Sequence, residues 1–331
     1  MKPVLTPDIV VAGAGLIGLS LALELQRRGA SVVVLDTAAA TGGASTAAAG
    51  MLAAEDPHNP AELLELSLFS ISLYDSFLDQ LAALSGSLVP YQTTSTLQYL
   101  EDGTTVRLAE RSVDPRQLAA AALQAVRRLK IPLLEHCGQL QIAEHSDAVS
   151  IIPSQGSAID AKRLIHASGA WFSGRPPIKP RKGQMLRVRI PAASELREVH
   201  RSALIYVVPR TQGPQAGTAL IGATEEDAGF DIHTSQAVLD QLRQRAAALL
   251  PAFGDTASAP QVEAWAGLRP ASADGLPLIG RLPGSARQWM AAGHYRNGIL
   301  LAPATASILA DVLEDRVPGI DVKRFDPARL V

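Results

Sequence analysis

The sequence contains a single cysteine, Cys137, in 331 residues. One thiol forms no intramolecular disulfide, and it excludes CxxC redox pairs and cysteine-rich zinc sites. Such a composition is ordinary for a reducing compartment, so we expect a cytoplasmic protein. The seven histidines show no HxxxH or similar metal-binding spacing, and we expect no metal site.

An excess of charge of one sign is also missing. The 30 Lys and Arg residues oppose 32 Asp and Glu residues, which gives a formal net charge of −2. A nucleic-acid-binding protein needs a basic face, so nucleic acid is not an expected partner. Hydrophobic residues make up 47% and charged residues 19% of the chain, which provides for a large core and argues against disorder. The length fits one large domain or two ordinary ones.

Hydrophobic runs long enough to cross a bilayer are lacking too. The uncharged run 9–23 is bounded by Asp8 and Glu24 and is too short for a membrane span. The alternative, a signal peptide, is disfavoured because an acidic residue directly precedes the run and no small-residue cleavage site follows it. The apolar stretch 298–313 contains Pro303 and predicts a buried helix. We therefore expect no membrane association.

The N-terminal part of the chain predicts a strand, a turn, a helix and a second strand. Residues 8–12 and 31–35 are short apolar runs typical of buried strands, and residues 19–28 have apolar residues at helical spacing. The joining turn follows the pattern GxGxxG, with Gly13, Ala14, Gly15 and Gly18. This β-turn-α-β unit is typical of dinucleotide-binding domains.

Each part of the pattern has a physical role in binding a dinucleotide. The first glycine permits a tight turn, the second lets the backbone approach a pyrophosphate, and the third lets helix and strand pack closely. The helix N-terminus supplies N–H groups and positive potential to the pyrophosphate. Asp36 ends the second strand, where a carboxylate accepts hydrogen bonds from ribose hydroxyls. The alternative is a Gly-rich packing turn in an unrelated α/β protein.

This unit does not separate NAD from FAD, but two later segments favour FAD. Residues 164–171 predict a strand that returns to the dinucleotide sheet, and they resemble the second FAD signature of glutathione-reductase-like flavoproteins. Residues 291–301 predict a strand, a turn and a helix whose N-terminus would face the N1–C2=O edge of a flavin. That edge gains negative charge on reduction, which a helix dipole stabilises.

Several segments together resemble the D-amino-acid oxidase superfamily and, within it, the glycine oxidases of the ThiO type. They keep the family's order over nearly the whole chain, at residues 13–20, 47–52, 182–184, 206–210, 222–224, 265–270, 274–275 and 293–305. AAAGML, GLRP and GHYRNGILLAP are specific to this group, whereas many flavoproteins share the first motif. The resemblance implies FAD bound without a covalent link.

Two local patterns make further predictions. Asp114 is a typical N-cap residue and Pro115 suits the first helical position, which predicts a helix that runs to Lys130. Residues 213–217 predict the turn of a hairpin between two strands.

The β-rich stretches interrupt the α/β framework, so we expect two interleaved domains. The fold is predicted to be α/β, and α+β overall, with a glutathione-reductase-like FAD-binding Rossmann domain and an antiparallel β-rich substrate domain. Residues 1–85, 111–172 and 262–331 are assigned to the first domain, and residues 86–110 and 173–261 to the second.

The resemblance also implies which positions contact FAD. Besides the glycine motif, they are Asp36, Thr37, Ala44, Ser45, Ala49, Gly50, Met51, Gln139, Ser168, Gly169, His294, Tyr295, Asn297, Gly298, Ile299 and Leu300. Asp36 stands where the family more often has glutamate. The shorter side chain reaches less far but keeps the carboxylate that accepts hydrogen bonds from the ribose. Gln139 stands where the family usually has an aliphatic residue, so the resemblance supports this FAD contact less strongly than the others.

The resemblance places substrate carboxylate binding on Arg296, with Tyr206, Arg269 and Ala53 as further pocket residues. A guanidinium binds a carboxylate through two parallel hydrogen bonds, which fixes the position of the α-carbon. The alternatives are a surface charge for Arg296, a core aromatic for Tyr206 and a structural ion pair for Arg269. We expect Glu225 to border the pocket and disfavour a second negative charge on the substrate; a solvated acidic turn is the alternative.

No acid/base pair is evident, which suits a reaction in which hydride passes directly from the substrate α-carbon to flavin N5. The resemblance implies oxidation of glycine or another small amino acid or amine, with O2 as acceptor and H2O2, ammonia and a 2-oxo acid as products. Glycine would give glyoxylate, and the expected role is in the thiazole branch of thiamine synthesis. Relatives are often tetramers, so a homo-oligomer is one expectation.

Other functions stay open. The substrate alternatives are D-alanine, D-proline and sarcosine, and the acceptor alternative is a quinone or protein in place of O2. A catalytically quiet flavoprotein partner subunit and an NAD-dependent dehydrogenase are the remaining alternatives.

Overall fold

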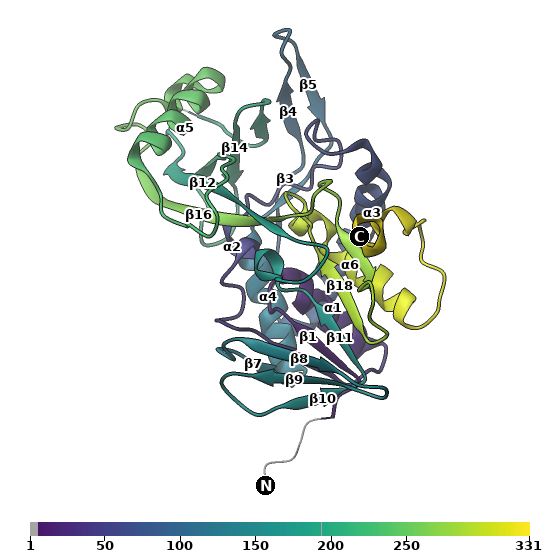
Figure 1. Ribbon diagram of the computed structural model, residues 1–331. Helices are drawn as coiled ribbons and strands as arrows, with labels where there is room; N and C mark the ends of the chain where they lie inside the picture. The colour runs from purple at the N-terminus through teal and green to yellow at the C-terminus, as the bar shows by residue number, and fades with distance from the viewer. Residues whose placement is uncertain (1–5, 193) are drawn as a thin grey trace.

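The computed structural model describes residues 6–192 and 194–331, and residues 1–5 of the predicted first domain lie outside this part (Figure 1). One sheet contains β1 (Ile9–Ala12), β2 (Val32–Leu35), β7 (Leu133–Leu134), β11 (Arg163–His166), β17 (Leu278–Arg281) and β18 (Gln288–Ala292). Its order is β17-β18-β11-β1-β2-β7, with β1 parallel to both β2 and β11. This confirms the predicted β-turn-α-β unit and the return of the strand near residue 164 to its sheet.

Both faces of this sheet are covered, which explains its continuous apolar strands. Val11 and Val34 pack in the same core as the helices α1 (Leu16–Arg27), α3 (Leu64–Ser85), α4 (Pro115–Arg128) and α6 (Gly298–Leu313). Val10 and Val33 face the opposite way, against a three-stranded sheet of β8 (Leu140–Glu144), β9 (Val149–Pro153) and β10 (Ile159–Ala161). The alternation follows from the two-residue period of a strand.

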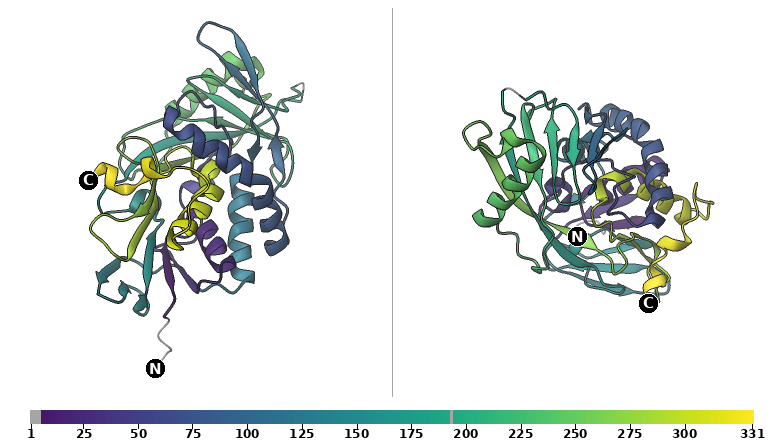
Figure 2. Two further views of the ribbon diagram at one scale, coloured as in Figure 1. Left: turned by 90° about the vertical axis from the view of Figure 1, so that its right-hand side faces the viewer. Right: turned by 90° about the horizontal axis from the view of Figure 1, so that it is seen from above.

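A second large sheet is mainly antiparallel. Its strands are β4 (Thr96–Tyr99), β5 (Thr105–Leu108), β12 (Lys179–Arg189), β13 (Val199–Arg201), β14 (Tyr206–Arg210), β15 (Thr218–Gly222) and β16 (Gln261–Ala271). They lie in the order β16-β12-β15-β14-β13-β4-β5. The helix α5 (Gln236–Leu249) packs on this sheet, which lies above the helical layer in the left view of Figure 2.

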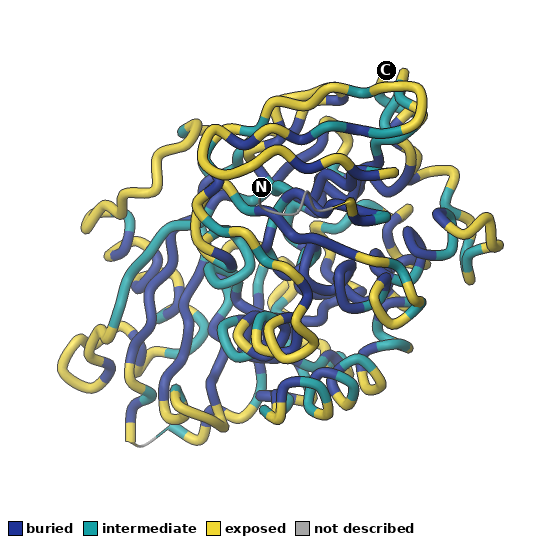
Figure 3. The backbone as a smooth tube through the Cα atoms, turned by 90° about the horizontal axis from the view of Figure 1, so that it is seen from below, coloured by how far each residue is buried: buried dark blue, intermediate teal, exposed yellow. Residues whose placement is uncertain are grey.

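The remaining elements are short. They are α2 (Ala44–Ala47), β3 (Tyr91–Thr93), β6 (Ser112–Val113) and single 3-10 turns at Ala61–Leu63, Gly169–Trp171, Pro251–Phe253, Lys323–Phe325 and Pro327–Leu330. Buried residues follow the strands and exposed ones the outer turns (Figure 3). No helix in residues 6–192 and 194–331 combines the length and apolar character that a membrane crossing requires.

Several local predictions are confirmed. Asp114 caps α4, since its carboxylate accepts the N–H of Arg116 at 2.9 Å and Pro115 is the first helical residue. The helix ends at Arg128, two residues earlier than predicted. The hairpin at residues 213–217 joins β14 and β15 as expected.

The interleaving of α/β and β-rich parts is also as predicted, because residues 96–108 and 179–222 share one sheet. One segment lies in a different sheet from the one implied by its predicted domain. Residues 262–271 were placed in the FAD-binding domain, yet β16 pairs with β12 from Lys179↔Ala271 to Val188↔Gln261. This long antiparallel pairing puts them in the sheet of the substrate domain.

Candidate active site

A cavity of about 1660 Å³ lies between the two large sheets. At one end it is lined by Gly13, Gly15 and Asp36, which follow β1 and β2. At the other end it is lined by Tyr206 of β14 and Arg269 of β16. The cavity therefore begins at the dinucleotide-type turn and ends against the seven-stranded sheet.

The turn after β1 is built without room for side chains. Gly13 has a φ of 120°, and a Cβ there would collide with the carbonyl group of Ala167. A Cβ on Gly18 would collide with the carbonyl of Gly13, so this glycine permits the close helix–strand packing. Gly15 is the N-cap residue of α1 and has no side chain of its own with which to cap the helix. The cradle and its N–H groups fit a pyrophosphate.

Asp36 is held in place by backbone donors. Its Oδ2 accepts the N–H of Ala14 at 2.7 Å, and its Oδ1 accepts the N–H of Ala38 at 2.9 Å. Ser45 accepts the N–H of Leu16 at 2.8 Å and joins the first turn of α1 to α2. A carboxylate fixed at the end of β2 fits the ribose of a dinucleotide.

The middle of the cavity lies between residues 47–51 and the turn that leads into α6. Two side chains of α3 hold the start of α6: Ser70 donates to the carbonyl of Leu300 at 2.6 Å, and Tyr74 to that of Ile299 at 2.9 Å. His294 in the turn contacts Thr305 Oγ1 through Nε2 at 2.9 Å. Burial lowers the pKa of His294 to about 3, so its ring is neutral.

Three candidate substrate residues converge at the far end. Arg296 and Tyr206 line the cavity together with Arg269, whose Nη1 donates to the carbonyl of Thr224 at 3.0 Å. A Cβ on Gly183 would lie 2.6 Å from Arg269 Cζ, so this glycine makes room for the guanidinium. Burial raises the pKa of Tyr206, against the opposing effect of the two arginines, so its hydroxyl stays protonated and can donate.

Glu225 lines the cavity beside Tyr295. Burial and then the hydrogen bond to the Glu225 carboxylate raise the pKa of Tyr295 to about 12. Glu225 therefore lies at the edge of the cavity and is exposed to solvent. In the described part of the chain, no three His, Cys, Asp or Glu side chains are arranged to share a metal ion.

Most of the predicted site residues line this one cavity, including Ala53, Gln139, Ser168 and Gly169. Ala14, Gly18 and Leu300 lie behind the wall instead. Ala14 acts through its N–H on Asp36, and Leu300 is buried in α6 with its carbonyl bound by Ser70.

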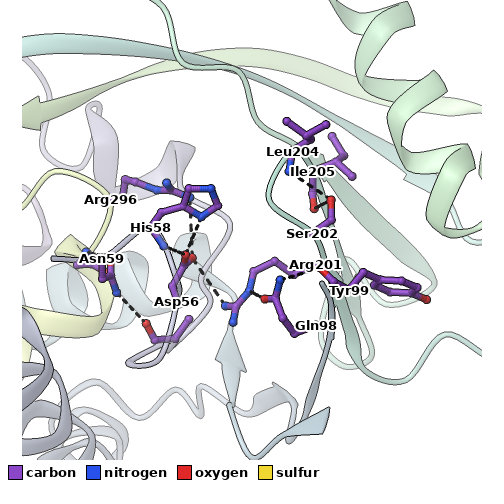
Figure 4. Close-up of polar contacts among 12 residues, drawn as sticks. Asp56, His58, Asn59, Gln98, Tyr99, Arg201, Ser202, Leu204, Ile205 and Arg296 are labelled. Carbon is purple, nitrogen blue, oxygen red and sulfur yellow. Dashed lines mark hydrogen bonds and ion pairs between the residues drawn. The ribbon is translucent and has the colours of Figure 1, made fainter. Parts of the chain in front are cut away.

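Sequence reasoning missed a charged cluster at the substrate end (Figure 4). Asp56 Oδ2 lies 3.8 Å from Arg296 Nη2 and 3.7 Å from Arg201 Nη1. Asp56 Oδ1 lies 2.9 Å from His58 Nδ1, and Arg201 also pairs with Glu110 at 3.0 Å. Asp56 and His58 lie in one loop, Arg201 lies in β13, and Glu110 lies between β5 and β6. Unlike Arg296, none of these four belongs to a recognised motif.

The fold and the cavity define a flavin-dependent redox enzyme, and the sequence comparison agrees. The chain matches the family described as FAD dependent oxidoreductase over residues 8–112 and 105–312, and it belongs to this family. The cofactor is therefore FAD, and the residues around the cavity fit it.

Within this family the chain is similar to glycine oxidases. It is 32% identical to the glycine oxidase of Pseudomonas aeruginosa, over 97% of this chain and 98% of that protein. The crystal structure of glycine oxidase from Geobacillus kaustophilus matches with a TM-score of 0.89 at 26% identity, covering 98% of this chain and 99% of the other.

A further relative is longer. The bifunctional protein ThiO/ThiG of Trichormus variabilis is 33% identical over 94% of this chain but only 53% of the relative, so this chain spans about half of its length.

Proposed function

We propose that the protein oxidises glycine or another small amino acid or amine at the carbon that bears the nitrogen. The convergence of Arg296, Arg269 and Tyr206 on the FAD cavity carries this proposal. The three residues come from the turn before α6 and from two strands of the other sheet, so only the folded chain brings them together. Similarity to glycine oxidases supports the same reaction class.

The two guanidinium groups would bind the substrate carboxylate, and the Tyr206 hydroxyl would add a third donor. Gly183 and Gly222 leave the space that these side chains need, since a Cβ on Gly222 would lie 2.9 Å from the Tyr206 hydroxyl oxygen. Three donors on the carboxylate fix the position of the substrate α-carbon. No base is then required to act on the α-carbon. Catalysis then rests on positioning and on exclusion of other orientations.

When bound, FAD supplies the hydride acceptor. We propose that Gly13, Gly15 and the first turn of α1 hold its pyrophosphate and that Asp36 holds a ribose. The ring would lie between residues 49–51 and the turn at residues 294–299. The other cavity-lining positions assigned to FAD are Thr37, Ala44, Ser45, Gln139, Ser168 and Gly169.

We further propose O2 as the electron acceptor, with H2O2, ammonia and a 2-oxo acid as products, and glyoxylate as the product from glycine. A role in the thiazole branch of thiamine synthesis and assembly into a homo-oligomer belong to the same proposal. They rest on the resemblance to ThiO-type glycine oxidases.

An oxygen electrode tests the acceptor. With glycine, sarcosine, D-alanine and D-proline in turn, the FAD-loaded protein should consume O2 and form equimolar H2O2 with at least one of them. Rapid reduction of an artificial dye with little O2 consumption would instead identify a dehydrogenase. Glyoxylate and ammonia measured after glycine turnover test the products.

A further inference from the structure

Ala47, Ala48 and Ala49 line the cavity, and carbonyl groups of the segment 46–49 accept hydrogen bonds from side chains that lie outside the cavity. Arg116 of α4 donates from Nε to the carbonyl of Thr46 at 3.3 Å. Trp265 of β16 donates from Nε1 to Ala47 at 3.0 Å, and Arg210 of β14 donates from Nη2 to Ala49 at 2.8 Å. Three donors from three elements thus fix three of the four carbonyls of this short segment.

The same two strands carry the candidate substrate residues. Tyr206 and Arg210 lie four positions apart on β14, and Trp265 and Arg269 lie four positions apart on β16. Side chains alternate between faces along a strand, so residues four apart share a face. Each strand therefore presents one pocket residue and one wall-binding residue to the same side.

The sheet register places Tyr206 and Trp265 in one row across the sheet. Tyr206 pairs with Gly222, Gly222 with Met185, and Met185 with Trp265. Met185 and Tyr206 pack together with Ala49 and Met51 in one apolar cluster. Because a hydrogen-bonded sheet deforms little, it sets the distance between the wall and the pocket.

Arg210 makes the strongest of the three contacts. Its side chain is 2% exposed, and burial lowers its pKa to about 10, so it stays charged at neutral pH. A hydrogen bond from a buried charged donor is stronger than a neutral one. Its Nη1 has no hydrogen-bond partner within residues 6–192 and 194–331, so Ala49 is its main anchor there.

Arg187 is a natural control. It lies beside Arg210 at the same buried site and is 9% exposed. It pairs with Glu263, which also binds Arg116 at 2.9 Å through both oxygens. Its guanidinium makes no hydrogen bond to the segment 46–49 in the described part of the chain.

We propose that Arg210, supported by Trp265 and Arg116, is a positioning residue for the flavin. By fixing the wall segment, it couples the placement of the ring to the strands that carry Tyr206 and Arg269. The inference rests on the proposed function in one respect, the location of the ring beside residues 49–51. It requires no particular substrate.

The test compares Arg210→Met with Arg187→Met. The FAD dissociation constant of each apoprotein is measured by fluorescence titration, and the flavin absorption and visible circular dichroism of the loaded protein are recorded. Arg210→Met should weaken FAD binding about tenfold, as expected for loss of a buried charged hydrogen bond, and change the flavin spectra. Arg187→Met should change neither, even if its unfolding midpoint falls. Arg210→Lys should restore part of the affinity.

Equal FAD affinities and spectra for Arg210→Met and the wild type would overturn the proposal, as would equal losses in both methionine variants. If Arg210→Met does not fold, Trp265→Phe removes one donor and keeps the ring, and it should shift the spectra in the same direction by less. None of these measurements uses a substrate. A protein that fails to oxidise any amino acid would therefore overturn the proposed function and leave this inference standing.

Discussion

Asp56 and Arg296 face each other at the substrate end of the cavity, with 3.8 Å between Asp56 Oδ2 and Arg296 Nη2 (Figure 4). The separation exceeds hydrogen-bond length, so the carboxylate balances the charge of Arg296 and leaves its N–H groups for a substrate. Arg201 approaches the same oxygen from β13, at 3.7 Å. One buried carboxylate thus lies between a cation on a strand of the seven-stranded sheet and a cation in the turn between β18 and α6.

Replacing Asp56 by asparagine should lower the free energy of unfolding by about 1–3 kcal/mol, because the nearly inaccessible Arg201 loses a counter-charge. Urea unfolding at pH 7 measures the change. Asp227→Asn is the control, since that residue is exposed and its ion pair with Arg181 lies on the surface. Equal losses in the two variants would contradict this role for Asp56.

The effect of Asp56→Asn on the free energy of unfolding should depend on pH. Burial raises the pKa of Asp56, but the opposing effect of Arg201 and Arg296 outweighs burial. The pKa in the folded protein therefore lies below its ordinary value. A carboxylate of this kind stabilises the fold above its unfolded pKa and loses that effect as the pH falls through its folded pKa. The stability difference between wild type and Asp56→Asn should therefore shrink in acid.

Gly183→Ala should impair substrate binding without affecting the cofactor. The added Cβ would lie 2.6 Å from Arg269 Cζ and would push the guanidinium out of place. We expect the KM for glycine to rise about 5- to 30-fold, because the substrate carboxylate loses one charged hydrogen bond. Unchanged FAD affinity in the same preparation is the control, and an unchanged KM would show that Arg269 does not bind the substrate.

His294 should make the protein less stable in moderate acid. Its pKa in the fold is about 3 against an ordinary 6.5. Between these values the unfolded chain binds a proton that the folded protein does not. The free energy of unfolding therefore decreases by up to about 1.4 kcal/mol for each unit by which the pH is lowered. His294→Gln should flatten this part of the curve, measured as unfolding midpoints from pH 4 to 7. A curve parallel to the wild type would exclude His294 as the cause.

Glu225 should select against a second carboxylate on the substrate. We expect Glu225→Gln to raise kcat/KM for iminodiacetate relative to glycine by about tenfold, since one like charge is removed from the pocket edge. Asp227→Asn removes a charge two residues away, outside the cavity, and should leave the ratio unchanged. A ratio that moves equally in both variants would point to net charge rather than to Glu225.

Local sequence patterns predicted the parts of the fold that depend on neighbours in the chain. The glycine motif and the cap at Asp114 carry their geometry in consecutive residues, and both are confirmed. Arg296, Tyr206 and Arg269 were found through motifs of the family, and the structure brings them into one cavity.

What the sequence did not reveal depends on contacts between distant residues. Strand β16 was assigned to the other domain because its pairing with β12 is not visible in its own residues. Asp56, Arg201 and Glu110 stand alone in the sequence, and only folding places their charges together. The backbone contacts of Arg210 and Trp265 are similarly invisible, since a bound carbonyl leaves no mark on residue type.

Anaerobic addition of glycine to the FAD-loaded protein shows whether a small amino acid reduces the flavin in this cavity, with flavin absorbance as the readout. Glycine or a small relative should bleach the wild-type flavin. Arg296→Ala should keep its FAD and require substrate concentrations higher by a factor that corresponds to about 2–4 kcal/mol. A flavin that no small amino acid bleaches would contradict the proposed function, and an Arg296→Ala protein bleached at wild-type concentrations would contradict the role of Arg296.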